Sequence, residues 1–130
     1  MRTVLETIVL ELPASEWLSS NQRLHWAQKA RRTRSIRTRA FMLGLAALRA
    51  GDVTARTGKT HVHVLVGYPT ARKADTPNSY PSVKAAIDGL VDAGVFPDDN
   101  SEHVSLGFDR DPKKSALGTY RLTLEMEPQS

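Results

Sequence analysis

The alternation of apolar and polar residues along the chain predicts four β-strands. In the first, Ile8, Leu10 and Leu12 share one face, while Val9 and Glu11 share the other. The polar segment between the last two strands, RDPKKSALG, is interpreted as a hairpin loop. The predicted strands cover residues 4–12, 61–66, 104–108 and 120–126.

Apolar residues at three- and four-residue spacing predict two helices. The second helix starts near Pro81, because a proline in the first turn lacks only an N–H that would be unpaired there, and Asn78 or Ser79 can cap it. It stops at Gly94. Its expected buried residues are Val83, Ile87, Leu90 and Gly94. The first helix is expected over residues 27–50, with a buried stripe of Ile36, Ala40, Leu43 and Ala47.

The resulting order β-α-β-α-β-β predicts an α/β or α+β fold, with a small mixed sheet of about four strands packed against two helices. At 130 residues the chain fits one domain, residues 1–130, which is large enough to bury a core. Only the tail, residues 127–130, is expected to be disordered.

Composition narrows the cellular setting and the type of partner. The net charge of +4 favours a polyanionic partner. The chain has no cysteine, which suits a reducing cytoplasm and excludes disulfides and thiolate metal sites. The longest apolar run, residues 41–48, is too short to span a membrane, and the start does not resemble a signal peptide. We expect a cytoplasmic protein.

A cluster of basic residues lies in the first half of the predicted first helix. No acidic residue interrupts it, whereas solvated helical faces usually mix glutamate with lysine. A solvated face is the alternative, but arginine matches phosphate oxygens well, and we favour contact with DNA phosphates. The residues are Lys29, Arg31, Arg32, Arg34, Arg37 and Arg39.

Aromatic and histidine residues give weaker signals. Trp17 is expected to fold back from the loop after the first strand as an apolar anchor. For Trp26, beside His25, we favour a place in the core, and stacking on an unpaired base is the alternative. His61 and His63 share one strand face, but without a third ligand they are interpreted as ordinary sheet residues rather than as a zinc site.

The segment around the start of the second helix combines acidic and basic residues in a way that suits a divalent cation held against a phosphate. Carboxylate oxygens bind Mg²⁺, and lysine or arginine neutralises the substrate. The acidic doublet that follows the helix is also typical of a turn after Pro97. The residues of this segment are Arg72, Lys73, Asp75, Asn78, Lys84, Asp98 and Asp99.

Three motifs follow one another here: D-x-x-N from Asp75, K-A-A-x-D-x-L from Lys84, and A-G-V-x-x-D-D from Ala93, with Val104 shortly after. Their order resembles the RusA-type Holliday junction resolvases, which are crossover junction endodeoxyribonucleases of bacteria and their phages. The resemblance covers residues 75–104, with weaker similarity in the N-terminal strand, the loop containing Asn21 and the basic helix.

The resemblance implies a small homodimer that binds four-way DNA junctions and nicks them with Mg²⁺ bound by aspartates. Transferred by position, Asp75 is the first metal-binding aspartate, Asp99 is the last, and Lys84 is the catalytic lysine. Asn78 is the asparagine of the motif, and Asp98 is expected to support the site. Mn²⁺ is expected to substitute for Mg²⁺.

Two features depart from the family pattern. The usual motif is D-x-D-N, but here Pro77 precedes Asn78, and a proline cannot bind metal. The spacing from Asn78 to Lys84 is also longer than in the best-known form. Either Asp98, Asn78 or water completes the site, or catalysis is impaired.

We therefore expect a Mg²⁺-dependent endonuclease that resolves four-way junctions in DNA recombination and repair. One alternative is a non-catalytic nucleic-acid-binding module that keeps the same fold and is impaired by Pro77. Another is a protein-interaction subunit whose basic helix binds an acidic partner.

Overall fold

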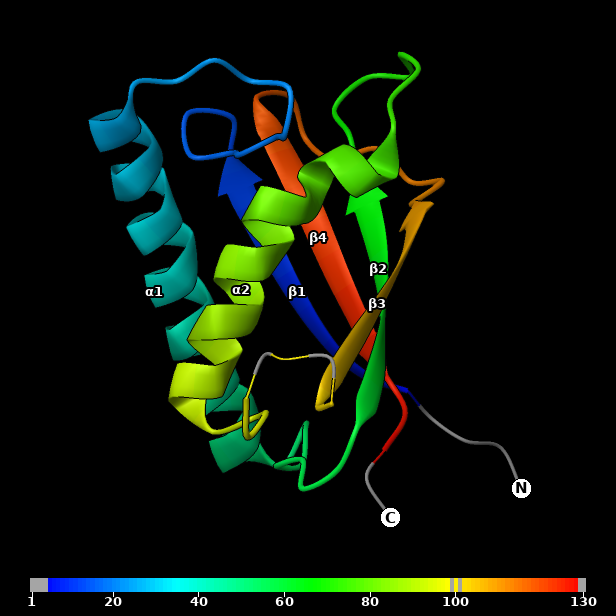
Figure 1. Ribbon diagram of the computed structural model, residues 1–130. Coiled ribbons are helices and arrows are strands. Elements are labelled where there is room, and N and C mark those ends of the chain that lie inside the picture. Colours follow the sequence, from blue (N-terminus) through cyan, green and yellow to red (C-terminus); the bar gives the residue numbers. More distant parts are fainter. Residues whose placement is uncertain (1–4, 99, 101, 129–130) are drawn as a thin grey trace.

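The computed structural model describes residues 5–98, 100 and 102–128, and it confirms the predicted α+β fold with its order of strands and helices. The elements, shown in Figure 1, are β1 (Glu6–Pro13), α1 (Trp26–Ala50), β2 (Thr60–Gly67), the 3₁₀ helix η1 (Thr76–Ser79), α2 (Tyr80–Ala93), β3 (Val104–Arg110) and β4 (Thr119–Met126). No helix in these ranges is long and apolar enough to cross a membrane.

The sheet has the strand order β1-β4-β2-β3, in which β4 is antiparallel to both of its neighbours and β2 is parallel to β3. The predicted hairpin between the last two strands is therefore wrong, because β2 lies between β3 and β4. Parallel neighbours need a crossover connection, and here α2 supplies it between β2 and β3. The loop after β3 then crosses the end of β2, where Asp111 N donates to Val66 O (2.9 Å) and Ser115 N to Tyr68 O (3.0 Å).

Both helices cover the same face of the sheet (Figure 1). Alternate strand residues face them and form the core, as the pattern of Ile8, Leu10 and Leu12 predicted. On α1 the prediction was wrong at one place: Leu43 is 37% exposed, and Gly44 is buried instead. The reason is the nearby α2, because a Cβ at Gly44 would lie only 2.9 Å from Leu90 Cδ2.

Gly89 allows the two helices to approach still more closely. A Cβ at this position would lie 2.2 Å from the Arg37 carbonyl oxygen and 2.8 Å from Ala40 Cβ. These atoms belong to the helical backbone and to a short side chain, so neither can move aside without moving α1. The absence of a side chain at Gly89 therefore sets the distance between α1 and α2.

The second helix begins and ends where the sequence signals predicted, but the predicted side-chain cap is wrong, because Ser79 makes no capping hydrogen bond, and Gly94 is exposed rather than buried. Pro81 lies in the first turn of α2, and Gly94 follows the last turn with a φ of 94°, a left-handed conformation that favours glycine. At the start of α1, His25 Nδ1 accepts a hydrogen bond from Ala27 N (3.2 Å). Trp26 is 76% exposed, so its predicted place in the core is wrong; Trp17 is the tryptophan that is buried.

We predict that Gly89→Ala lowers the free energy of unfolding by about 1–3 kcal/mol, the usual cost of an overpacked contact. Helix propensity alone predicts the opposite sign, since alanine is favoured over glycine by ~1 kcal/mol within a helix. Denaturant unfolding measures the difference. Gly58→Ala is the control, because no atom lies within 4 Å of the added Cβ. A Gly89→Ala protein as stable as the parent would show that the helices are free to separate.

Candidate active site

Three connections meet at one end of the sheet. β1, β2 and β3 all end there and β4 begins there, as their parallel and antiparallel pairings require (upper end in Figure 1). The β1–α1, β2–η1 and β3–β4 connections are thus adjacent, together with the start of α2. In open sheets flanked by helices, ligands bind outside the carboxyl ends of the strands. A ligand-binding site is therefore expected at this end of the sheet.

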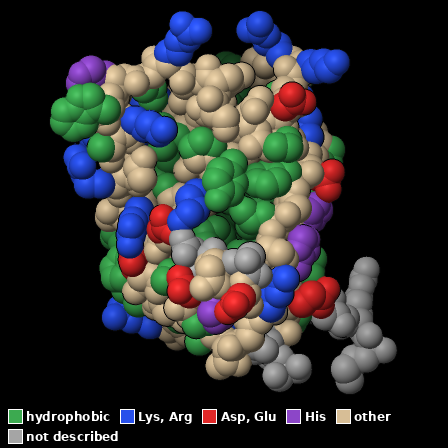
Figure 2. Space-filling view, in the orientation of Figure 1, with side chains coloured by type: hydrophobic (Ala, Val, Ile, Leu, Met, Phe, Trp, Pro, Cys, Tyr) green, Lys and Arg blue, Asp and Glu red, His purple; other side chains and the backbone are tan. Residues whose placement is uncertain are grey.

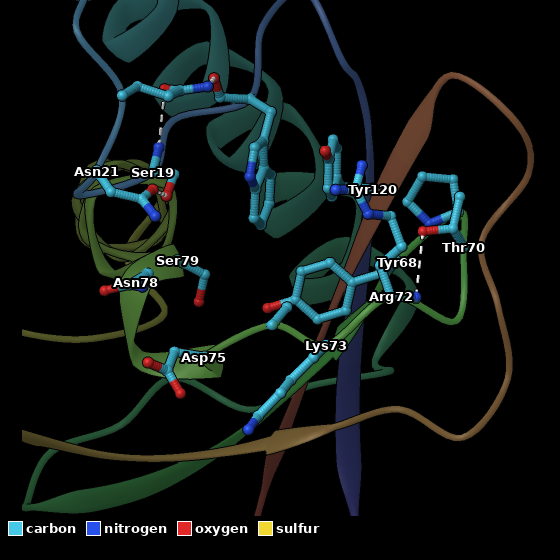
Figure 3. A pocket seen from close by; sticks show the side chains of 14 residues that line it. Ser19, Asn21, Tyr68, Thr70, Arg72, Lys73, Asp75, Asn78, Ser79 and Tyr120 are labelled. Atoms are coloured by element: carbon cyan, nitrogen blue, oxygen red, sulfur yellow. Dashed lines mark hydrogen bonds between the residues drawn. The ribbon is translucent and has the colours of Figure 1, made fainter.

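A cavity of about 450 Å³ opens at this end, and we call it the strand-end cavity. Figure 3 shows Asp75, Asn78 and Ser79 on one side of it and Tyr68 and Lys73 on another. It is lined by Trp17, Ser19, Asn21, Gln22, Tyr68, Pro69, Thr70, Arg72, Lys73, Ala74, Asp75, Asn78, Ser79 and Tyr120. The structure thus brings together four of the predicted site residues: Arg72, Lys73, Asp75 and Asn78.

Asp75 and Asn78 lie at the two ends of one tight turn. Asp75 immediately precedes η1, is exposed, and makes no side-chain capping hydrogen bond. The backbone of Asn78 is held on both sides, since its N–H donates to Asp75 O (3.0 Å) and its carbonyl accepts from Ser20 N (2.8 Å). Within the described residues, neither side chain forms a hydrogen bond. A fixed backbone therefore presents a carboxylate and an amide to the cavity.

The basic residues of the cavity are carried by the same β2–η1 loop. Arg110 fixes this loop by donating to Arg72 O and Thr70 O, both at 2.7 Å, while its guanidinium lies 4.7 Å from the centre of the Tyr68 ring. Arg110 therefore has a structural role, because its contacts are with the β2–η1 loop and Tyr68. The side chains of Arg72 and Lys73 are exposed and have no acidic partner among the described residues.

Aromatic rings form the inner wall of the cavity. Trp17 and Tyr120 stack face to face with centroids 4.4 Å apart, and Tyr68 meets Tyr120 edge-on at 6.0 Å. Burial raises the pKa of the Tyr68 hydroxyl; the charge of Arg110 opposes this, and that of Asp75 adds to it. The hydroxyl therefore stays protonated at neutral pH and is available as a hydrogen-bond donor.

Lys84 and Asp98 do not line the cavity. Lys84 donates to Asp88 Oδ1 (2.7 Å), the i,i+4 pair expected on a helix surface. Asp98 is exposed and follows the far end of α2, whose 14 residues span about 21 Å, and its Oδ2 accepts from Asn100 Nδ2 (3.3 Å). Asp99, the last predicted metal ligand, lies outside the described residues.

The donor atoms of the cavity decide whether it could hold a metal ion. Across residues 5–98, 100 and 102–128, no three histidine, aspartate or glutamate side chains form a group that could hold a metal ion. The cavity itself offers the Asp75 carboxylate and the Asn78 amide oxygen, both oxygen donors of the kind that Mg²⁺ prefers. These two residues fit part of a magnesium site, and a second carboxylate must come from elsewhere.

Two arginines of the basic cluster on α1 bind the β1–α1 loop. Arg32 donates to Trp17 O (2.9 Å), and Arg39 to the Glu16 carboxylate (2.9 Å). The Ser35 hydroxyl, and after it Arg39, lowers the pKa of Glu16, so this carboxylate is ionised. These bonds fasten the β1–α1 loop, and with it one wall of the cavity, to α1.

Other members of the cluster differ in exposure and pairing. Arg37 makes two hydrogen bonds to Asp92 on α2, at 2.6 and 2.9 Å, and so joins the helices. Lys29, Arg31 and Arg34 are exposed and pair with no acidic side chain in the part of the chain that the structure describes. These three residues are the ones in the cluster best placed to bind an external anion.

Figure 2 shows how charge is distributed over one face of the molecule. Lys and Arg side chains gather at the upper end and along the side over α1, while most of the visible Asp and Glu side chains lie in the lower half and a few lie at the upper right. The connections at the upper end contain more basic than acidic residues: Arg23, Arg72, Lys73, Lys113 and Lys114 against Glu16, Asp75 and Asp111. The strand-end cavity therefore opens at the positive end of the molecule.

Sequence reasoning missed the aromatic wall. Tyr68 gave a local signal, because it follows a buried strand directly and precedes the basic residues of the loop. Trp17 was correctly placed in the interior, but nothing local indicated that it stacks on Tyr120. Their contact depends on the pairing of β1 with β4.

His63 is the centre of a second polar cluster, on the sheet face away from the helices. Its Nε2 lies 2.7 Å from Asp109 Oδ2, and its Nδ1 lies 3.2 Å from Glu125 Oε1. His61 contacts Ser105 Oγ instead (2.9 Å). The hydrogen bond to Asp109, and after it that to Glu125, raises the pKa of His63. This cluster joins three strands and lies outside the strand-end cavity.

A comparison with protein-family models finds none that matches the chain, and a comparison with curated proteins finds no significant match.

We predict that His63 stabilises the fold in acid rather than in base. Its folded-state pKa is raised above the ordinary value of 6.5, so its contribution is complete below 6.5 and is lost as the pH rises through the folded-state pKa. The stability difference between the parent and His63→Gln should shrink over that range in denaturant unfolding. His61→Gln, whose parent ring contacts Ser105, is the control. A difference that does not change with pH would contradict the prediction.

Proposed function

We propose that this protein is a Mg²⁺-dependent endonuclease that cleaves branched DNA of the four-way junction type. The observation that carries the proposal is the strand-end cavity, in which Asp75 and Asn78 face the same space as Arg72 and Lys73 at the positive end of the molecule. This arrangement suits a phosphodiester held beside a cation. The motif order from Asp75 to Val104 supports the same function independently.

Asp75 and the Asn78 amide oxygen are the proposed metal ligands within the cavity. The sequence motif names Asp99 as a further ligand with Asp98 beside it, but Asp98 follows the far end of α2 and lies outside the cavity, so the second carboxylate is left unassigned. Bound Mg²⁺, or Mn²⁺ in its place, would supply a Lewis acid and an activated water.

The basic residues orient the substrate in this proposal. Arg72 and Lys73 bind the phosphates on either side of the scissile bond, because both side chains are exposed at the rim of the cavity. Lys84, the lysine that the motif assigns to catalysis, does not line the cavity and pairs with Asp88 Oδ1 (2.7 Å) on the first turns of α2, so a role at the leaving oxygen would require it to leave that partner.

The rest of the DNA is proposed to follow the positive surface over α1. Lys29, Arg31 and Arg34 would bind phosphates there. Trp26, at the start of α1, is exposed enough to stack on a base, the alternative role considered for it from sequence.

A second candidate function is DNA binding without cleavage, and one observation favours it. Pro77 occupies the place of an expected carboxylate, and Asp75 is the one acidic residue among those that line the cavity. A site with too few carboxylates would hold Mg²⁺ weakly while keeping its positive surface.

We also propose that the active form is a homodimer, because a four-way junction presents two equivalent strands and a two-fold axis supplies two equivalent sites. Sedimentation at micromolar concentration should give twice the monomer mass, and a monomeric mass with and without junction DNA would contradict this.

We predict that Asp75→Asn reduces junction cleavage by more than about 100-fold, beyond the effect usual for residues that only support a metal ligand. Junction binding in EDTA should stay close to the parent value, because the basic side chains are untouched. Asp52→Asn makes the same chemical change at an exposed position after α1, at the other end of the molecule, and should leave both properties intact. Parallel loss of cleavage and binding in Asp75→Asn would contradict a metal role.

We predict that replacing Arg31 and Arg34 with alanine reduces the salt dependence of junction binding. Each lost phosphate contact should lower the slope of log K against log salt by about 0.9, so the double variant should lose about 1.8. The control replaces Arg37 and Arg39, which are paired with Asp92 and Glu16. Equal losses of slope in the two double variants would contradict this prediction, because the arginines paired inside the protein would then contribute to DNA binding as much as Arg31 and Arg34.

A further inference from the structure

We propose that the strand-end cavity receives one unstacked nucleotide of the DNA strand, with its base against Tyr68 and its phosphate at Arg72 and Lys73. This inference rests on the proposed DNA substrate and adds a recognition site to it. It does not depend on cleavage.

The size of the cavity fits a single nucleotide. At about 450 Å³ it lies within the range of pockets that enclose one small ligand, roughly 300–1,000 Å³. It is also lined on several sides, by the β1–α1 loop, the β2–η1 loop, η1 and the start of β4. A duplex can therefore lie across its mouth, but only an extruded residue can enter.

The aromatic wall provides a flat apolar surface for a base. Tyr68 is partly exposed at the cavity, whereas Trp17 and Tyr120 are committed mainly to each other. Arg110 lies over one face of the Tyr68 ring, and Tyr120 meets the ring at an interplanar angle of 84°, so the ring is held before a ligand arrives. A fixed ring loses little entropy when a base stacks on it.

Two amide side chains can read the edge of such a base. Asn78 makes no side-chain hydrogen bond to a described residue, and with its oxygen assigned to the metal its amide N–H groups are still available to a base. Asn21 Oδ1 accepts from the Ser19 hydroxyl, which leaves its amide N–H groups available to the cavity. With the Tyr68 hydroxyl, the cavity thus offers donors and an acceptor around a flat ring, the combination that binds an unpaired base.

The rim selects a nucleotide that belongs to a strand. Arg72 and Lys73 bring positive charge to the opening, but Asp75 beside them opposes a free nucleotide with its full phosphate charge. A phosphodiester carries a single charge per residue and gains from the rest of the positive end. Bases at a branch point are also already partly unstacked, which lowers the cost of extruding one.

The test measures binding in EDTA, so that cleavage plays no part. Tyr68→Leu removes the flat ring, and Tyr68→Phe keeps it. Each variant is titrated with a four-way junction, with the same junction carrying an abasic residue at each crossover position in turn, and with linear duplex. Thermal denaturation confirms that each variant is folded.

We expect Tyr68→Leu to weaken junction binding about 10-fold, the scale of one lost base–aromatic stack, while Tyr68→Phe stays within about threefold. One abasic position should weaken the parent by a similar factor and cause no further loss in Tyr68→Leu. Duplex binding should not change. Additive losses at every abasic position, or an equal loss on duplex, would overturn the proposal.

A competition experiment distinguishes a nucleotide within a DNA strand from a free nucleotide as the occupant of the cavity. Deoxynucleoside monophosphates at millimolar concentration should fail to displace the junction, and displacement by them would overturn the choice of a DNA strand. The outcome is also distinct from the nuclease proposal. A protein that shows the abasic signature but cleaves nothing would refute the nuclease alone, and one that cleaves without the signature would refute this inference alone.

Discussion

The close contact between α1 and α2 is the constraint on which the rest of the structure depends. Gly89 allows the backbone of α2 to approach Arg37 and Ala40 more closely than any side chain would permit, and both helices lie on the same sheet face. Once that distance is fixed, the start of α2 is fixed relative to the strand ends. Asp75 and η1 immediately precede that start, so helix packing decides where the carboxylate lies.

Arginines of α1 combine two roles that the sequence alone does not separate. Arg32 and Arg39 bind the loop that carries Trp17, and Arg37 joins the two helices through Asp92. Their internal bonds place the aromatic wall of the strand-end cavity, while their exposed neighbours on α1 keep the surface positive. Under the proposed function, a substitution in this cluster can therefore affect DNA binding either directly or by loosening the cavity.

The sequence predicted the elements of the fold well, because alternation and helical spacing are local properties. The prediction failed where contacts with residues distant in sequence determine the structure. Tertiary packing determines that β2 lies between β3 and β4, and that Gly44 is buried in place of Leu43. The site divides in the same way. Asp75 and Asn78 lie three residues apart and were predicted together, whereas the stack of Trp17 on Tyr120 required the β1–β4 pairing.

We propose that the strand-end cavity supports metal-dependent cleavage of branched DNA. The most direct measurement is incubation of the parent protein with a synthetic four-way junction, in Mg²⁺ and in EDTA, followed by strand analysis. The account predicts paired nicks at symmetric positions in Mg²⁺, none in EDTA, and little cleavage of linear duplex. Junction binding without cleavage in either Mg²⁺ or Mn²⁺ would contradict it.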